Sequence, residues 1–221
     1  MEAAMKTAAL FVLALAAALL LSVGPARAQD LEKPVLLVAV PALQGLYRET
    51  TLIAVPVAGA HIGFILNRAS ALKLGVLFPR HEPSSKVVDP VYFGGPEMSE
   101  AVFAVVHGDP GASALHLLGG VFVVSNAAAV DRIIEQTPNE ARYFAGFVGW
   151  RPGELAKEIE AGYWATGEAD ESLFFRPDTS GLWKELIERF GGASLPKWHA
   201  REVREPGGGV AVGGRTPIAA R

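Results

Sequence analysis

The chain has 221 residues, a formal net charge of −3, no cysteine and 50% hydrophobic residues. This length accommodates one domain or two small ones. The absence of cysteine excludes thiol nucleophiles, cysteine-bound zinc, iron–sulfur clusters, a lipoprotein anchor and disulfides. The mildly acidic balance argues against a protein that mainly neutralises phosphates, as nucleic-acid-binding proteins do.

The N-terminal segment has the pattern of a secretory signal peptide. An uncharged apolar run over residues 8–23 follows a lysine and leads into the A-x-A pattern of Ala26–Ala28. We expect cleavage after Ala28 and a periplasmic or secreted protein, with Met5 as an alternative initiator and an uncleaved anchor as the alternative reading. Removing residues 1–28 changes the net charge to −4, and no later segment is long and apolar enough to span a bilayer.

The first part of the remaining chain predicts a hairpin and a short helix. Val35–Val40 and Thr50–Val57 are apolar or β-branched and read as strands. A turn at Ala58–Ala60 leads into a partner strand, Ile62–Leu66. Ser70–Phe78 carries apolar residues at helical spacing and predicts a short helix or helical turn.

The middle of the chain predicts further strands joined by turns. His81–Lys86 is a polar loop, and Val87–Phe93 returns to extended structure. Gly94-Gly95-Pro96 is a tight turn. Ala101–Val106 and Gly120–Val124 are predicted strands.

The last part predicts three helices around one strand. Ser125 is the expected N-cap of a helix over Ala127–Gln136. Ala141–Trp150 is a buried strand, Pro152 stands in the first turn of the next helix, and Leu182–Phe190 forms the last one.

Neighbouring strands joined by short turns, without regular alternation with helices, favour one α+β domain with mainly antiparallel strands over residues 29–199. Residues 200–221 have no periodic apolar face and include the glycine-rich Gly207–Gly214. We expect this segment to be a disordered tail.

Familiar catalytic motifs are absent, including the phosphate loop, H-E-x-x-H, G-x-S-x-G and the EF-hand loop. Ser70 and Lys73 match S-x-x-K, in which one helical turn brings a lysine amine to a serine hydroxyl. The K-T-G and S-D-N partners of that motif are missing, so a solvated helix start is the favoured interpretation.

The histidines and carboxylates do not form a recognisable metal or catalytic pattern. No two of the five histidines stand at helical spacing, and we expect His107 to be a strand-end residue bonded to a loop carbonyl. Glu154 and Glu158 lie one helical turn apart but share their segment with other charges, which favours a solvated face. An acidic cluster at residues 168–171 lacks the ligand spacing of a calcium loop.

An ordered series of motifs has a less generic explanation. The series comprises Leu37–Leu43, Gly63–Arg68, Gly94-Gly95-Pro96, His107, Gly146–Leu155, Glu158-Ile159 and Trp164. In this order the motifs resemble the YqgE/AlgH family, also labelled UPF0301, from about Pro34 to Gly192. The resemblance implies an α+β fold in which a bifurcated sheet forms a pseudo-barrel with flanking helices, and it implies no established activity.

The chain also departs from the family pattern. Where the family usually shows Leu-x-Asp-Pro, this chain has Leu43-Gln44-Gly45-Leu46, and the usual proline after Asn-Arg is Ala69. The arginine that usually follows the Gly-Gly-Pro turn has no evident counterpart. If the missing aspartate and arginine serve a shared polar site, this chain has lost part of it. Most members lack a signal peptide, so the chain resembles an exported branch.

These observations favour a non-catalytic binding or interaction module in the cell envelope, without metal or cofactor. Its partner is expected to be an envelope protein or a small anionic ligand rather than a nucleic acid. The candidate positions are Asn67, Arg68, Gly94, Gly95, Pro96, His107, Trp150 and Gly153.

Two further hypotheses concern these positions. The Gly94-Gly95-Pro96 turn, with Arg68 nearby, is a candidate anion-recognising edge, although its glycines are better explained by turn geometry. Trp150 is expected in the core rather than in a pocket.

Two alternative functions stay open. An unrecognised envelope hydrolase requires His107 and Asn67 to converge with serine or aspartate partners. A transcriptional regulator, as the family label suggests, is disfavoured by export and by the acidic balance.

Overall fold

The computed structural model describes residues 30–111 and 114–191. The expected signal peptide and the expected tail lie outside these residues. The chain divides into two compact units, Met1–Asp30 and Leu31–Arg221, and nearly all of the described residues belong to the second. Among the described residues, no helix has the length and apolar character needed to cross a membrane.

The described residues contain ten strands and four α-helices, with three short 3-10 turns. The strands are β1 (Val35–Ala39), β2 (Thr51–Val57), β3 (Ala60–Ile65), β4 (Ala69–Lys73), β5 (Pro90–Phe93), β6 (Glu97–His107), β7 (Ala114–Leu118), β8 (Val121–Val124), β9 (Ala141–Trp150) and β10 (Trp164–Glu168). The helices are α2 (Leu74–Leu77), α3 (Ala127–Gln136), α4 (Glu154–Glu160) and α5 (Leu182–Gly191). The 3-10 turns are η1 (Gly45–Tyr47), η2 (Glu82–Lys86) and η3 (Glu171–Phe175).

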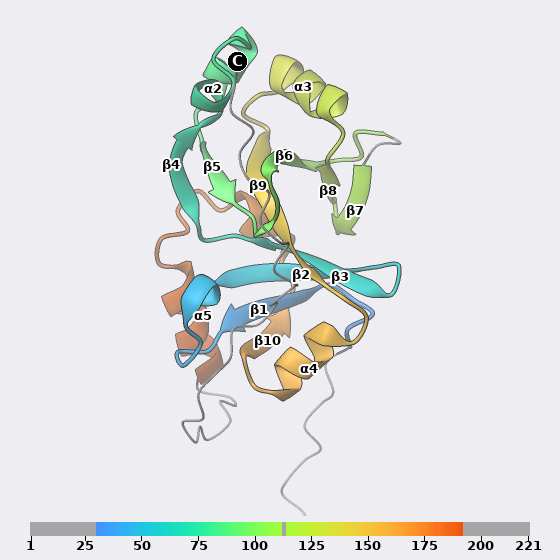
Figure 1. The fold of residues 1–221 in the computed structure, drawn as a ribbon, viewed down its shortest axis with the longest axis vertical. Coiled ribbons are helices and arrows are strands. Elements are labelled where there is room, and N and C mark those ends of the chain that lie inside the picture. Colours follow the sequence, from blue (N-terminus) through green and yellow to red (C-terminus); the bar gives the residue numbers. More distant parts are fainter. Residues whose placement is uncertain (1–29, 112–113, 192–221) are drawn as a thin grey trace, which may run out of the picture. The chain divides into compact units, whose positions relative to one another are not determined.

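The strands form one mostly antiparallel, branched sheet. Its main path runs β10-β1-β2-β3-β9-β6-β8-β7, while β5 pairs with both β4 and β9. The β5–β9 pair is parallel, and the other pairs are antiparallel. In Figure 1, β1, β2, β3 and β10 occupy the lower half, and β4 to β8 occupy the upper half. This arrangement confirms the expected α+β fold with a bifurcated sheet.

Strand β9 joins the two halves of the sheet. Its residue Phe144 lies opposite Tyr92 of β5 on one side and opposite Phe103 of β6 on the other. Its last residues pair with β3, where Trp150 lies opposite His61. The branch point is therefore a single strand that serves three neighbours, which explains why the sequence order of the strands is irregular.

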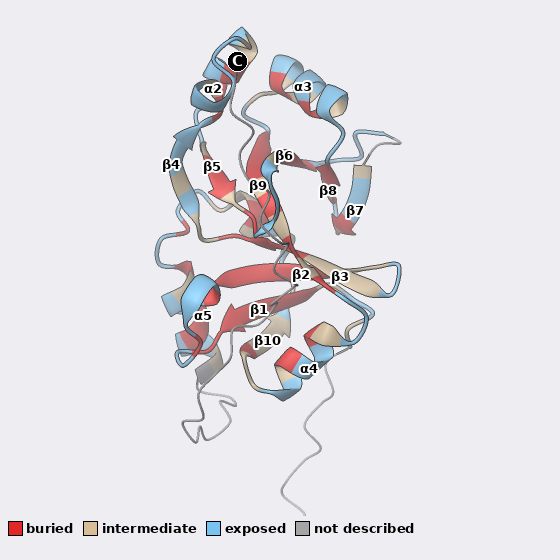
Figure 2. Cartoon of the chain, in the orientation of Figure 1, coloured by how far each residue is buried: buried red, intermediate tan, exposed pale blue. Residues whose placement is uncertain are grey.

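Both faces of the central strands are buried, and the domain has three apolar clusters. Alternate residues of β1 point to opposite faces: Leu36 packs in one cluster with α5, and Leu37 packs in a second cluster under α4. The third cluster lies between α3 and the upper strands and includes Val130 and Ile134. Figure 2 shows β1 buried along its length. The long apolar runs of the sequence reflect this two-sided burial.

Several predicted elements are confirmed. The β2–β3 hairpin, α3, β9 and α5 agree with the sequence-based predictions to within two residues. The N-cap of α3 is Asn126 rather than Ser125, because the Asn126 side chain accepts a hydrogen bond from the Ala129 N–H at 3.2 Å. Helix α4 begins at Glu154, after Gly153 in a left-handed conformation, so Pro152 precedes the helix instead of standing in its first turn. Strands β7 and β10 were not predicted.

The predicted helix over Ser70–Phe78 is wrong in its first half. Residues Ala69 and Lys73 pair with β5, and only the short α2 is helical. The Lys73 ammonium donates to the Val88 carbonyl at 2.8 Å, while the Ser70 hydroxyl accepts from the Leu72 N–H. The S-x-x-K match therefore lies mainly on a strand, where no helical turn brings its serine and lysine together.

Candidate functional site

The sequence-predicted residues Asn67 and Arg68 line a polar hollow beside the end of β3. We call it the arginine hollow; it measures about 580 Å³ and is lined by Gln44, Gly45, Arg48, Glu49, Asn67, Arg68 and Ser180. Three separate stretches of the chain supply these residues: the η1 segment, the β3–β4 connection and the start of α5. Only the second stretch was identified from the sequence as a candidate site.

Asn67 fixes one wall of the arginine hollow. Its side-chain oxygen accepts a hydrogen bond from the Thr51 N–H at 2.9 Å, and its amide donates to the Glu49 carbonyl at 2.8 Å. Glu49 has a positive φ of 54°, which is uncommon for a residue with a side chain. The two hydrogen bonds hold this turn in place, so Asn67 shapes the hollow through its neighbours.

Arg68 supplies a partly buried cation. Its Nη2 group donates to the Arg48 carbonyl at 3.1 Å and to the Thr50 hydroxyl at 2.9 Å. Thr50 is fully buried, so the guanidinium is anchored at its inner end. These two acceptors are neutral, and neither Arg68 nor Arg48 forms an ion pair with any carboxylate in the described part of the chain.

The charges around the arginine hollow are unbalanced. Burial lowers the pKa of Arg68, an effect that Tyr47 opposes and the nearby Arg48 adds to. An arginine stays protonated at neutral pH despite such a shift. Two guanidinium groups and the Glu49 carboxylate line the hollow, so its formal charge is positive although the whole chain is acidic. This arrangement suits an anion that can accept hydrogen bonds from guanidinium N–H groups.

The Gly94-Gly95-Pro96 turn does not form the anion-recognising edge considered above. Both glycines are buried. The Gly94 N–H donates to the Ala145 carbonyl at 2.8 Å, and the Gly94 carbonyl accepts from the Ile65 N–H at 3.0 Å. A Cβ atom at Gly94 or Gly95 would collide with the backbone of β9. The glycines are there because two chain segments cross closely, and Pro96 follows them as an exposed residue.

His107 lies in a different hollow from Asn67. It ends β6 and lines a cavity of about 550 Å³ together with Asp109 and Arg132. Its ring stacks on Phe175, with centroids 4.1 Å apart and an interplanar angle of 25°, and within the described residues it forms no hydrogen bond to a loop carbonyl. The convergence of His107 and Asn67 that a hydrolase reading requires is not present.

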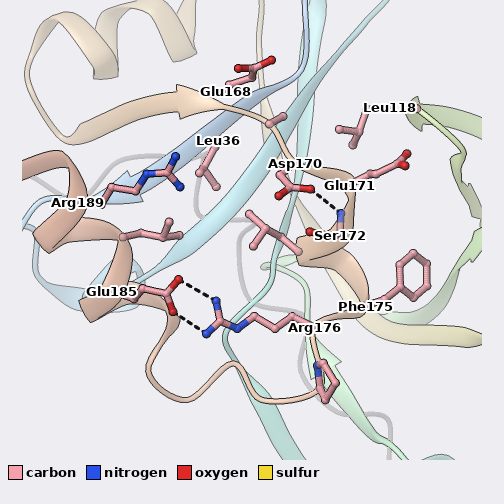
Figure 3. Close-up of a pocket in the computed structure, with 15 residues that line it drawn as sticks. Leu36, Leu118, Glu168, Asp170, Glu171, Ser172, Phe175, Arg176, Glu185 and Arg189 are labelled. Atoms are coloured by element: carbon pink, nitrogen blue, oxygen red, sulfur yellow. Dashed lines mark hydrogen bonds and ion pairs between the residues drawn. The ribbon is translucent and has the colours of Figure 1, made fainter.

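A hollow of about 900 Å³ lies between η3 and α5. Figure 3 shows Arg176 paired with Glu185 and Asp170 hydrogen-bonded to Ser172, whereas Glu168 and Arg189 have no interaction marked with the residues drawn. Arg176 forms a two-pronged ion pair with Glu185, with N–O distances of 2.6 and 3.1 Å. Glu171 accepts from the Gly120 N–H at 2.6 Å, and Asp170 caps η3. Within the acidic cluster of residues 168–171, Asp170 and Glu171 therefore accept hydrogen bonds from backbone N–H groups and have structural roles.

Trp150 and Gly153 have structural roles, and Glu158 has one that sequence reasoning missed. Trp150 is buried, as expected. Its indole N–H and that of Trp164 both donate to Oε2 of Glu158 at 2.9 Å. Glu158 is only 6% exposed, so the solvated face predicted for this residue is wrong. The sequence feature that could have revealed this role is the position of Glu158 between Trp150 and Trp164 in one motif block.

In the described residues, no group of three histidine, aspartate or glutamate side chains lies close enough together to hold a metal ion.

Comparison with known proteins identifies the family. The sequence profile described as AlgH-like matches residues 36–195. The chain belongs to the AlgH-like family. A UPF0301 protein of Saccharophagus degradans is 32% identical over 163 residues, which cover 70% of this chain and 80% of the relative. A UPF0301 protein of Chlorobium limicola is 30% identical over 135 residues, covering 59% of this chain and 71% of the relative.

Two solved structures of AlgH-like fold are similar to this chain. The solution structure of the AlgH protein from Pseudomonas aeruginosa superposes with a TM-score of 0.60 at 23% identity, covering 80% of this chain and 98% of that one. A crystal structure of a Corynebacterium diphtheriae protein gives a TM-score of 0.58 at 24% identity, covering 73% and 88%. At these identities the likeness establishes the AlgH-like fold and leaves activity open.

Proposed function

We propose that the protein is a non-catalytic binding module of the cell envelope that holds a small anionic ligand in the arginine hollow. The single observation that carries the proposal is the guanidinium of Arg68, which is partly buried, anchored by neutral acceptors and without a carboxylate partner in the described residues. A cation that is partly removed from water is stabilised by an anion that replaces the lost hydration. The envelope location rests on the signal-peptide pattern of residues 8–28.

The composition of the hollow favours a ligand with carboxylate or phosphate oxygens. Within the described residues Arg68 donates only through Nη2, so Nε and Nη1 keep their donors for a ligand. Arg48 is exposed on the opposite segment and supplies a second cation. Ser180 adds a hydroxyl, although this hydroxyl and the Ser180 N–H both donate to Asp178. Two arginines flanking one polar space are typical of sites for compact anions.

The position that departs from the family pattern lines the same hollow. Gly45 stands where the family usually has aspartate, and it lies on the wall shared with Arg48. A carboxylate at this position would neutralise one of the two arginine charges. Its replacement by glycine supports an anion-binding role for this chain in particular.

The test is calorimetric titration of the protein with inorganic phosphate and, in a separate arm, with acetate. Arg48→Met keeps the side-chain length and removes an exposed charge, and Arg151→Met is the matched control on an exposed arginine outside the hollow. Loss of a charge-assisted contact of roughly 1.5–3 kcal/mol predicts about 10- to 100-fold weaker binding for Arg48→Met. Equal affinities of the two variants, or no binding by the wild type, would overturn the proposal.

A further inference from the structure

Exposed apolar side chains are concentrated at one end of the described domain. Of the eight large hydrophobic residues that are exposed in the described residues, five lie between positions 72 and 88. They are Leu72, Val76, Leu77, Phe78 and Val88, and we call them the apolar tip. Figure 2 shows α2 and much of β4, which together carry Leu72, Val76 and Leu77, as exposed. Val76, Leu77, Phe78 and Pro79 are consecutive exposed residues, a pattern that is a defect in a soluble surface unless it has a function.

The apolar tip is built on a well-anchored base. Leu74, between the exposed residues, is fully buried in the third apolar cluster, and Val87 is buried beside it. Gly75 lies so close to Ser85 that a Cβ atom would stand 3.0 Å from the Ser85 Cα. The exposure of the tip is therefore a property of an ordered surface, because its supporting residues are packed.

Hydrogen bonds from a distant segment fix the other side of the base. Asn139 accepts from the Val88 N–H at 3.0 Å and donates to the Lys86 carbonyl at 3.1 Å. The Lys73 ammonium donates to the Val88 carbonyl. Val88 is thus held by its backbone while 62% of its surface faces solvent.

Cations surround the apolar tip although the chain as a whole is acidic. Lys73, Arg80 and Lys86 are exposed within the same segment. Asp89 lies 3.8 Å from the buried Arg142, and Glu135 of α3 lies 4.0 Å from His81. Within the segment itself, Glu82 is the acidic residue that opposes the three cations. The segment is therefore apolar and basic at once.

We propose that the apolar tip docks on an anionic lipid bilayer. Val76, Leu77, Phe78 and Val88 carry no side-chain hydrogen-bonding group, so hydrocarbon can receive them without leaving a polar group unsatisfied. The flanking cations lie within reach of the phosphate groups at the bilayer surface. None of the three hollows described above is lined by a residue of the tip.

A second copy of the chain is a less suitable occupant. Face-to-face pairing of two tips would bring Lys73, Arg80 and Lys86 of both copies together, and like charges at an interface oppose association. This inference is independent of the arginine hollow, because no residue of the tip lines that hollow.

The test uses the absence of cysteine from the chain. A Val76→Cys variant of the full chain is labelled with an environment-sensitive fluorophore and titrated with vesicles of phosphatidylcholine alone or mixed with phosphatidylglycerol. Leu115→Cys, an exposed apolar position on β7, is the matched control. Because the label reports its own surroundings, binding of vesicles elsewhere on the chain does not mimic insertion of the tip.

We expect a blue-shifted emission at position 76, but not at position 115, with the anionic vesicles. Combining Arg80→Gln with Lys86→Gln weakens the apparent affinity about tenfold or more. An unchanged emission at position 76 would overturn the proposal, as would an equal shift with neutral vesicles. A doubled mass in light scattering that Val76→Ser abolishes would assign the tip to a second copy instead.

Discussion

At the scale of single residues, Glu158 is the most informative position in the structure. Its carboxylate is buried and accepts the indole N–H groups of both Trp150 and Trp164 on one oxygen. Burial raises the pKa of Glu158, and the two indole hydrogen bonds oppose this effect. The carboxylate therefore fixes two tryptophans of the second apolar cluster, at the cost of burying an acid.

We predict that Glu158→Leu is far more destabilising than Glu158→Gln. Leucine leaves two buried indole donors without an acceptor, which costs roughly 1–3 kcal/mol for each donor. Glutamine keeps a carbonyl oxygen for them and removes the buried charge. Urea unfolding of both variants measures the difference, and equal destabilisation would contradict the structural role assigned to the hydrogen bonds.

Stability should also depend on pH through Glu158. Because its pKa in the folded protein is raised above the ordinary value of 4.5, the folded state binds the proton more tightly than the unfolded state does. The contribution of Glu158 to the free energy of unfolding is thus full below pH 4.5 and falls as pH rises through the raised pKa. Glu158→Gln lacks this dependence, so its stability relative to the wild type should increase with pH above 4.5. A pH-independent difference would contradict the raised pKa.

At the scale of elements, the crossing of β9 with its neighbours determines where glycine is required. Gly146 has a positive φ of 69°, and a Cβ atom there would collide with the carbonyl oxygens of Gly95 and Glu97. Gly153, before α4, has a similar φ of 76° but open space around it. Substitutions at Gly153 and Gly146 therefore distinguish the free-energy cost of a left-handed backbone conformation from the added cost of a steric collision.

We therefore predict different losses for the same substitution. Gly153→Ala should cost about 1 kcal/mol, from the left-handed conformation alone. Gly146→Ala should cost about 3 kcal/mol or more, because the collision adds to that strain. Thermal unfolding compares them, and similar melting temperatures would show that β9 and the Gly95 segment do not approach as closely as described.

The elements also show what the sequence could predict. The β2–β3 hairpin and α3 are encoded by local patterns and were predicted. Strand β4 was not, because Leu74 and Phe78 stand at helical spacing while the pairing of Ala69 and Lys73 with β5 is a long-range contact. Burial of Glu158 likewise depends on Trp150 of β9 and Trp164 of β10, which one helix cannot reveal.

The same limit applies to the arginine hollow. Asn67 and Arg68 were identified from their place in a motif. Arg48 and Ser180 carry no motif, and they reach the hollow only because the η1 segment and the start of α5 fold against the end of β3. Only the folded chain shows that the position lacking the family aspartate, Gly45, lines the same space.

At the scale of the whole molecule, the described residues of the three apolar clusters, including Leu31 packed against the second, all lie after position 28. Cleavage after Ala28 would therefore remove none of these described residues. We predict that the protein recovered from a periplasmic extract begins near Gln29 when its N-terminus is sequenced. A sequence that begins at Met1 or Met5 would contradict cleavage after Ala28.

The central claim is that an unpaired positive charge in the arginine hollow binds an anion, and a pair of substitutions at one position tests it most directly. Gly45 has a φ of 69°, a conformation in which aspartate and asparagine are both enriched among non-glycine residues. Gly45→Asp and Gly45→Asn therefore make similar conformational demands and differ in charge. In calorimetric titration with inorganic phosphate, we expect about tenfold or greater loss of affinity for Gly45→Asp and near-wild-type affinity for Gly45→Asn. Equal affinities of the two variants would contradict the claim.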